Sequence, residues 1–191
     1  MAAESIRILL ASGSLRAGST NSALLRTAAG VAPPGISTAL YERLADLPHF
    51  NPDDDEEGRE VPAAVAAMRT ELARADAVLF STPEYAGALP GSFKNMLEWS
   101  VGGHEIYRLP AAWVNAAAPG RGVNADDSLA KVLGYVGADI VEPCCVRIPV
   151  ARDQLGADGL IADAGIGAAL TAVLADLAAH VERRRADPDW Y

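Results

Sequence analysis

The chain has 191 residues, of which half are hydrophobic and 6% aromatic, and its formal net charge is −9. A chain of this length is enough for one domain with a full core. The negative charge argues against nucleic acid or an anionic membrane as a partner, because both would repel it. An anionic ligand gains nothing from this overall field, so local groups would have to hold it.

The few cysteines and the first residues bear on the cellular compartment. Cys144 and Cys145 are adjacent and cannot cross-link distant segments, so nothing indicates an oxidising compartment. Residues 1–4 lack the basic start of a signal peptide, and we expect no apolar run of membrane-spanning length. These features predict a cytoplasmic protein.

Apolar runs alternate with segments of helical periodicity along the chain. The five predicted strands cover residues 5–12, 36–41, 77–82, 111–117 and 139–149. The five predicted helices cover residues 21–31, a segment that opens at 62, and residues 92–101, 126–136 and 165–185. Pro143 stands inside the last strand, and because proline cannot donate to the ladder, this strand should lie at a sheet edge or be bulged.

This alternation predicts an α/β fold with helices on both faces of a parallel sheet. With a ligand loop after the first strand, the strand order becomes 2-1-3-4-5, a flavodoxin-like three-layer sandwich formed by one domain over residues 1–191. Ligands of such sheets bind at the carboxyl ends of the strands, where the order reverses. The loops after strands one, three and four should therefore meet.

The loop after the first strand, residues 12–21, has the side chains of an anion site. Hydroxyl, amide and guanidinium groups precede a helix start, whose free N–H groups also favour negative charge. A Walker loop would need a lysine, and the dinucleotide fingerprint would need a third glycine. The loop therefore suits a terminal phosphate; the alternative is an ordinary turn with Ser19 or Asn21 as a helix cap. The candidate phosphate contacts are Ser14, Arg16, Gly18, Ser19, Thr20 and Asn21.

The loop after the third strand, residues 82–95, contains two prolines and two glycines. Its backbone is both stiff and free to take unusual dihedral angles. Such a loop can offer N–H groups to a flat heterocycle while Tyr85 packs on one face, or it can simply cover the sheet end. A phosphate at the first loop and a ring at the second indicate a mononucleotide, and FMN fits best.

The segments Gly13–Asn21 and Pro83–Asn95, with Trp99 after the second, resemble the two signatures of the NADPH-dependent FMN reductase family. This family includes quinone, azo-dye and chromate reductases, and the resemblance extends over nearly the whole chain. It implies that hydride passes from NADPH or NADH through bound FMN to a small acceptor such as a quinone, azo compound, free flavin or metal oxyanion. It also implies a homodimer or homotetramer.

Carried over by position, the resemblance implies that the first loop holds the FMN phosphate and that later loops line the isoalloxazine ring. No protein residue need be catalytic, because the flavin performs the chemistry. Two departures are visible: Ala86 stands where the family usually has asparagine, and residues 116–120 replace a serine-containing loop, which leaves only main-chain contacts. The implied ring contacts are Pro83, Glu84, Tyr85, Ala86, Gly87, Ala117 and Ala118.

Other residues point to simpler roles. His49, His104 and His180 are far apart in sequence, so we predict no metal site. The acidic run at residues 53–57 is typical of a solvated loop, and Trp190 and Tyr191 form an aromatic tail that could dock on a partner subunit. An FMN-binding electron carrier and a mononucleotide-binding regulatory protein, both without nicotinamide turnover, are the alternative functions.

Overall fold

The structure is a computed structural model that describes residues 5–187. The features noted at residues 1–4 and at Trp190 and Tyr191 lie outside the described residues. A parallel sheet forms the centre of the molecule, with β1 (Ile6–Ser12), β2 (Ile36–Tyr41), β3 (Ala77–Ser81) and β4 (Pro110–Asn115) as its main strands. Their order is β2-β1-β3-β4-β5, which confirms the predicted flavodoxin-like topology.

The edge strand beside β4 is broken. The predicted continuous strand is wrong: two short pieces, β5 (Asp139–Ile140) and β6 (Val146–Arg147), each pair in parallel with β4. A 3₁₀ turn that contains Pro143 separates them. The expectation that proline would force an edge or bulged position is confirmed, because this residue has no N–H to give to the ladder.

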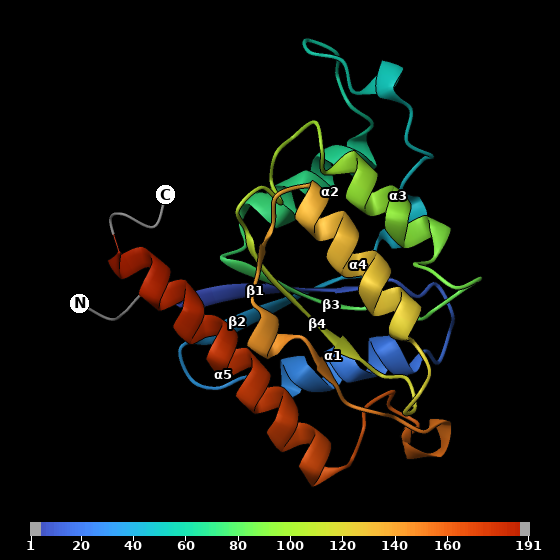
Figure 1. Cartoon of the computed structure of the whole chain (residues 1–191), viewed down its shortest axis with the longest axis vertical. Helices are drawn as coiled ribbons and strands as arrows, with labels where there is room; N and C mark the ends of the chain where they lie inside the picture. Colours follow the sequence, from blue (N-terminus) through green and yellow to red (C-terminus); the bar gives the residue numbers. More distant parts are fainter. Residues whose placement is uncertain (1–4, 188–191) are drawn as a thin grey trace.

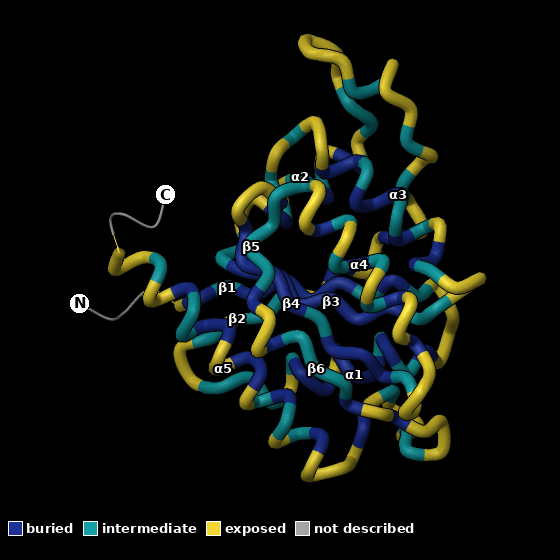
Figure 2. The backbone as a smooth tube through the Cα atoms, viewed as in Figure 1, coloured by how far each residue is buried: buried dark blue, intermediate teal, exposed yellow. Residues whose placement is uncertain are grey.

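Helices cover both faces of the sheet (Figure 1). On one face lie α1 (Thr20–Gly30) and α5 (Ala164–Ala186), and on the other lie α2 (Ala63–Ala73), α3 (Gly91–Trp99) and α4 (Val123–Tyr135). Alternate side chains of β1 serve the two faces: Ile8 and Leu10 pack toward α1 and α5, whereas Leu9 packs toward α2 and α3. Figure 2 shows the sheet as the buried centre of the molecule.

Contrary to expectation, α5 is long and apolar enough to cross a membrane by length and composition alone, with a mean hydropathy of 1.6 over 18 residues. The apolar side chains of this helix pack against one face of the sheet. The buried residues of the helix are Ile166, Leu170, Val173, Leu174, Leu177, Ala178 and Val181. This is the pattern of a core helix.

The connection between β2 and α2 projects beyond the helical layer at the top of Figure 1. The sequence predicted that the acidic run within this connection is simply a solvated loop, but one of its carboxylates is anchored. Asp55 accepts two hydrogen bonds from Arg69 Nη2, at 2.7 and 2.9 Å, and both side chains are largely buried. Arg69 also donates to the carbonyl of Trp99, so Asp55 ties the connection to α2 and α3.

Candidate functional site

The loop between β1 and α1 leaves main-chain donors available. Ser19 is the N-cap of α1, and its hydroxyl accepts from Ser22 N at 3.4 Å, so the helix-cap alternative holds for this side chain. Gly18 has a φ of 67°, which turns the chain into the helix. Within residues 5–187, no acceptor takes the N–H groups of Gly18, Thr20 or Asn21. Free N–H groups at a helix start form a binding site for anions.

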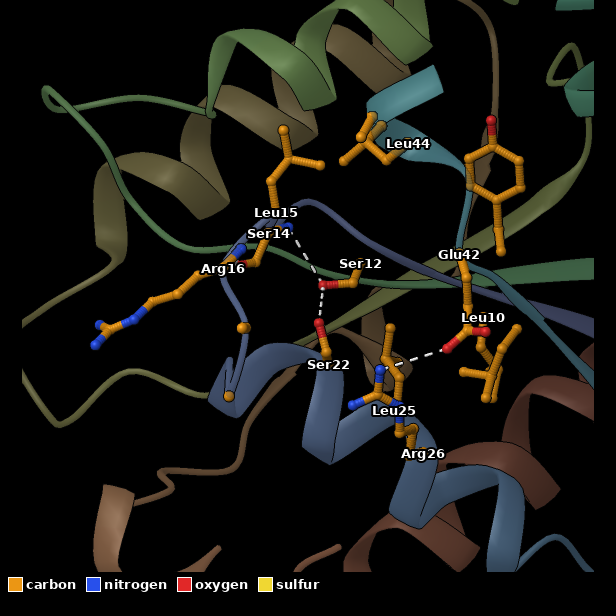
Figure 3. Close-up of a pocket in the computed structure, with 15 residues that line it drawn as sticks. Leu10, Ser12, Ser14, Leu15, Arg16, Ser22, Leu25, Arg26, Glu42 and Leu44 are labelled. Carbon is orange, nitrogen blue, oxygen red and sulfur yellow. Dashed lines mark hydrogen bonds and ion pairs between the residues drawn. The ribbon is translucent and has the colours of Figure 1, made fainter. Parts of the chain in front are cut away.

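Arg16 is the only charged side chain of this loop, and it is exposed. Among the described residues, none forms an ion pair with it, although most other arginines have a carboxylate partner. Figure 3 shows its side chain extending away from the Ser12–Ser22 pair and from Glu42 and Arg26. Ser14 Oγ accepts from Arg16 N at 3.3 Å and so shapes the turn. Its hydroxyl hydrogen remains free to donate.

Asn21, the sixth predicted phosphate contact, is turned inward. It is buried, and its side-chain amide lies 3.0 Å from Ser81 Oγ. Ser81 Oγ also donates to the carbonyl of Val114, at 2.8 Å. Ser81 therefore joins the side chain of Asn21 in α1 to the main chain of β4 at the carboxyl ends of β3 and β4. Sequence reasoning did not single out Ser81, because a buried serine inside a strand carries no motif.

A cavity of about 320 Å³ lies beside the first loop, on the side of β2 (Figure 3). Predicted residues Ser14, Arg16 and Gly18 line it, together with β2 and the turn that follows. No predicted residue from the loops after β3 and β4 lines it. The cavity therefore includes part of the predicted phosphate loop and none of the predicted ring contacts.

The loop after β3 contains a tight reverse turn. Tyr85 and Ala88 exchange two main-chain hydrogen bonds, at 3.0 and 3.1 Å, around Ala86 and Gly87. Both central residues have positive φ, 51° and 74°, as a type I′ turn requires. This conformation is strained for alanine and readily adopted by asparagine or glycine. Tyr85 is 52% exposed at the start of the turn, close after Pro83.

Glu84 joins this loop to the next one. Its carboxylate accepts from Asn124 N and from Asn124 Nδ2, each at 3.0 Å. A carboxylate at the first turn of a helix satisfies a free N–H group and complements the helix dipole. This explains why α4 begins at Val123, three residues before the predicted start: its cap comes from a distant loop.

The loop after β4 is held by its own polar groups. Ala117 N donates to Asn115 Oδ1 at 2.9 Å, so this predicted ring contact has its N–H already engaged. Asn115 Nδ2 donates to the carbonyl of Gly122 and to Asp126 Oδ1, at 3.0 and 2.7 Å. Burial raises the pKa of Asp126 above its ordinary value. The N–H of Ala118 donates to no other described residue.

The first and second loops touch at Gly13. Its N–H donates to the carbonyl of Ser81 at 2.9 Å. A Cβ atom at this position would lie 2.3 Å from Thr82 Oγ1 and 2.9 Å from the Phe93 ring, so only glycine fits. The three loops that the sequence predicted to meet are thus joined by Gly13, Ser81 and Glu84. None of these contacts follows from a local pattern, because each partner lies far along the chain.

Histidines and cysteines are the remaining side chains that the sequence singled out. Among residues 5–187, no group of three potential metal ligands occurs. His180 Nε2 lies 2.8 Å from Asp139 Oδ2, beside α5 and far in sequence from the loops. Burial raises the pKa of Cys144 to about 11 and that of Cys145 to about 12, so both stay protonated thiols at neutral pH.

Together, the sheet order, the free donors after β1 and the adjoining loops after β3 and β4 define a flavodoxin-like mononucleotide-binding protein. Residues 6–153 match the model of the NADPH-dependent FMN reductase family. The chain therefore belongs to this family, as its two motifs predicted.

Individual relatives agree. An NAD(P)H-dependent FMN reductase of Pseudomonas aeruginosa is 35% identical over 84% of this chain and 86% of its own length. A probable NADPH:quinone oxidoreductase of rice is 31% identical over 93% of each chain. The structure of the flavoenzyme NAD(P)H:(acceptor) oxidoreductase FerB from Paracoccus denitrificans superposes with a TM-score of 0.78, at 26% identity over 93% of this chain and 98% of that one. The prediction of an FMN-dependent oxidoreductase that uses NAD(P)H is confirmed.

Proposed function

We propose that the loop between β1 and α1 holds the phosphate of FMN. The observation that carries this proposal is the set of unsatisfied N–H groups at Gly18, Thr20 and Asn21, next to an arginine without an ion-pair partner among the described residues. A phosphate monoester has enough acceptor oxygens to meet them all. Because the net charge is −9, binding depends on this local set. The hydroxyls of Ser14 and Thr20 add donors, while the side chains of Ser19 and Asn21 hold the loop in shape.

The isoalloxazine ring would lie against the loops after β3 and β4. Tyr85 offers an exposed aromatic face, and the main chain from Pro83 to Gly87 is fixed by the tight turn. Ala118 offers a free N–H group, whereas Ala117 and Glu84 act indirectly by shaping the loops. The cofactor-binding set then divides into residues that touch FMN and residues that place them.

Bound FMN would accept hydride from NAD(P)H and pass two electrons to a small acceptor, such as a quinone, azo compound, free flavin or metal oxyanion. The protein itself would supply position and electric field. The main-chain N–H groups of Ala86 and Gly87, which no acceptor among the described residues takes, would stabilise negative charge that develops on the ring. No side chain near the three loops has to exchange a proton for this task.

We also propose a homodimer or homotetramer that works in the cytoplasm, where nicotinamide coenzymes are supplied. An apolar groove between α3 and α4 supports self-association: Leu97, Val101, Val132 and Val136 line it, and Tyr135 beside it is 91% exposed. Lys94, Glu98 and Lys131 at its margin offer charges of both signs. Light scattering at micromolar concentration tests this, and a monomer would refute it.

A visible absorption spectrum, followed by anaerobic addition of NADPH or NADH, tests the function. We expect flavin absorption in the protein as purified or after incubation with FMN, bleaching by NAD(P)H, and recovery when a quinone is added. A protein that holds FMN without being bleached would be an electron carrier. A protein that takes up no FMN would contradict the proposal.

A further inference from the structure

The loop after β4 can offer FMN little except its main chain. Ala116, Ala117, Ala118, Pro119 and Gly120 have no polar side-chain group. The exact placing of the main chain therefore decides whether this loop fits a ring. A residue that sets this placing would control flavin binding without touching the flavin.

Arg147, on the edge strand β6 that pairs with β4, contacts this loop through its side chain. Its Nη1 donates to the carbonyl of Ala118 at 3.3 Å and to the carbonyl of Arg121. Its Nη2 lies 3.1 Å from Asp126 Oδ2. Both side chains of this ion pair are about three-quarters buried, with 27% and 23% exposed. One planar guanidinium thus holds two points of the loop and the first turn of α4 together.

The contacts of Arg147 continue into a closed network. The other carboxylate oxygen of Asp126 accepts a hydrogen bond from Asn115 Nδ2. Asn115 also accepts from Ala117 N and donates to the carbonyl of Gly122. The loop is packed closely here, because a Cβ atom on Gly122 would lie 2.8 Å from the Cβ of Ala117. Loss of Arg147 would release two carbonyls and leave the largely buried carboxylate of Asp126 without its cation.

The broken edge of the sheet makes this arrangement possible. The chain leaves β4 at the Pro143 turn and rejoins it as β6, where Arg147 is paired in register with Asn115. The side chain then lies beside the loop that continues from Asn115. A continuous strand without the turn would change this register and the direction of the side chain.

We infer that Arg147 is a positioning residue for FMN: through the carbonyls of Ala118 and Arg121 and the carboxylate of Asp126, it fixes the main chain that faces the ring. This inference rests on the proposed function. It assigns to the family's flavin site a residue outside both signature motifs, on the far side of the loop from the cofactor.

Fluorescence quenching of FMN by Arg147→Met and by the wild-type protein tests the inference. We expect the variant to bind FMN about tenfold more weakly, the effect of losing charge-assisted hydrogen bonds that hold a binding loop. Hydrogen exchange of the FMN-free proteins should show faster exchange at residues 117–122 in the variant. Arg147→Lys keeps the charge beside Asp126 but not the fork, so its affinity should lie between the two.

Arg7→Met is the matched control. Arg7 is a partly buried arginine, ion-paired with Glu71 at 2.5 Å, at the other end of the sheet. Its loss should lower stability and leave the dissociation constant of FMN unchanged. If Arg147→Met binds FMN within twofold of the wild type, the inference is wrong, and if that variant does not fold, the same result for Arg147→Lys overturns it. A wild-type protein that binds no FMN refutes the proposed function itself.

Discussion

The loops after β1 and β4 both lie at the carboxyl ends of the strands, but their polar groups are used in opposite ways. The first loop leaves three main-chain N–H groups and the Arg16 guanidinium without a partner among the described residues. The loop after β4 uses its groups internally, through Asn115, Asp126 and Arg147. The first is arranged to receive a charge, and the second to keep a shape. Substitutions in the first loop should therefore alter binding directly, and those behind the second should alter it through main-chain placement.

The largest effect is expected at Arg16. Arg16→Met should raise the dissociation constant of FMN roughly 100-fold, because charge-assisted hydrogen bonds to a phosphate are lost. Calorimetry or fluorescence titration measures this. Arg59→Met is the control, since Arg59 is ion-paired with Asp54 on the β2–α2 connection. If the two variants bind FMN with equal affinity, Arg16 makes no specific contribution to FMN binding.

The next largest effect is expected for Gly13→Ala, which should lower the free energy of unfolding. The added methyl group would overlap Thr82 and Phe93, at the point where the first and second loops meet. Overpacking of this kind costs about 2 kcal/mol of unfolding free energy, which urea titration measures. Gly134→Ala in α4 is the control: apart from the adjacent residues and the backbone of α4 itself, no atom lies within 4 Å of the new methyl group, and a gain of about 0.5 kcal/mol is expected. A stable Gly13→Ala protein would contradict the close contact.

Ala86→Gly should have a smaller effect of the opposite sign. Glycine adopts the positive φ of position 86 without strain, so the free energy of unfolding should rise by about 0.5–1 kcal/mol. Ala88→Gly serves as the control, because Ala88 has no positive φ and glycine there should destabilise. If both variants lose stability equally, the strain at Ala86 is not real.

The two cysteines beside the loop after β4 should resist chemical labelling. Cys145 is near Asp126, and burial raises its pKa to about 12, while that of Cys144 is raised to about 11. Since the thiolate forms only as the pH rises toward these values, labelling by a disulfide reagent at pH 8 should be at least about 100-fold slower than in urea. Rapid labelling of the folded protein would mean that this region opens easily.

Patterns within single segments predicted most of the fold. The strand order and the meeting of three loops followed from apolar runs, glycines and the rules for parallel sheets. Local patterns failed where a distant residue decides the outcome. The early start of α4 depends on Glu84, the anchoring of the acidic run depends on Arg69, and the break of the edge strand brings Arg147 to the loop after β4.

The binding of FMN and of riboflavin to the same protein tests the central idea most directly, because the two ligands differ only by the phosphate. If the loop between β1 and α1 holds that phosphate, FMN should bind roughly 100-fold more tightly than riboflavin, and Arg16→Met should remove most of the difference. Equal affinity for the two ligands in the wild-type protein would contradict the account.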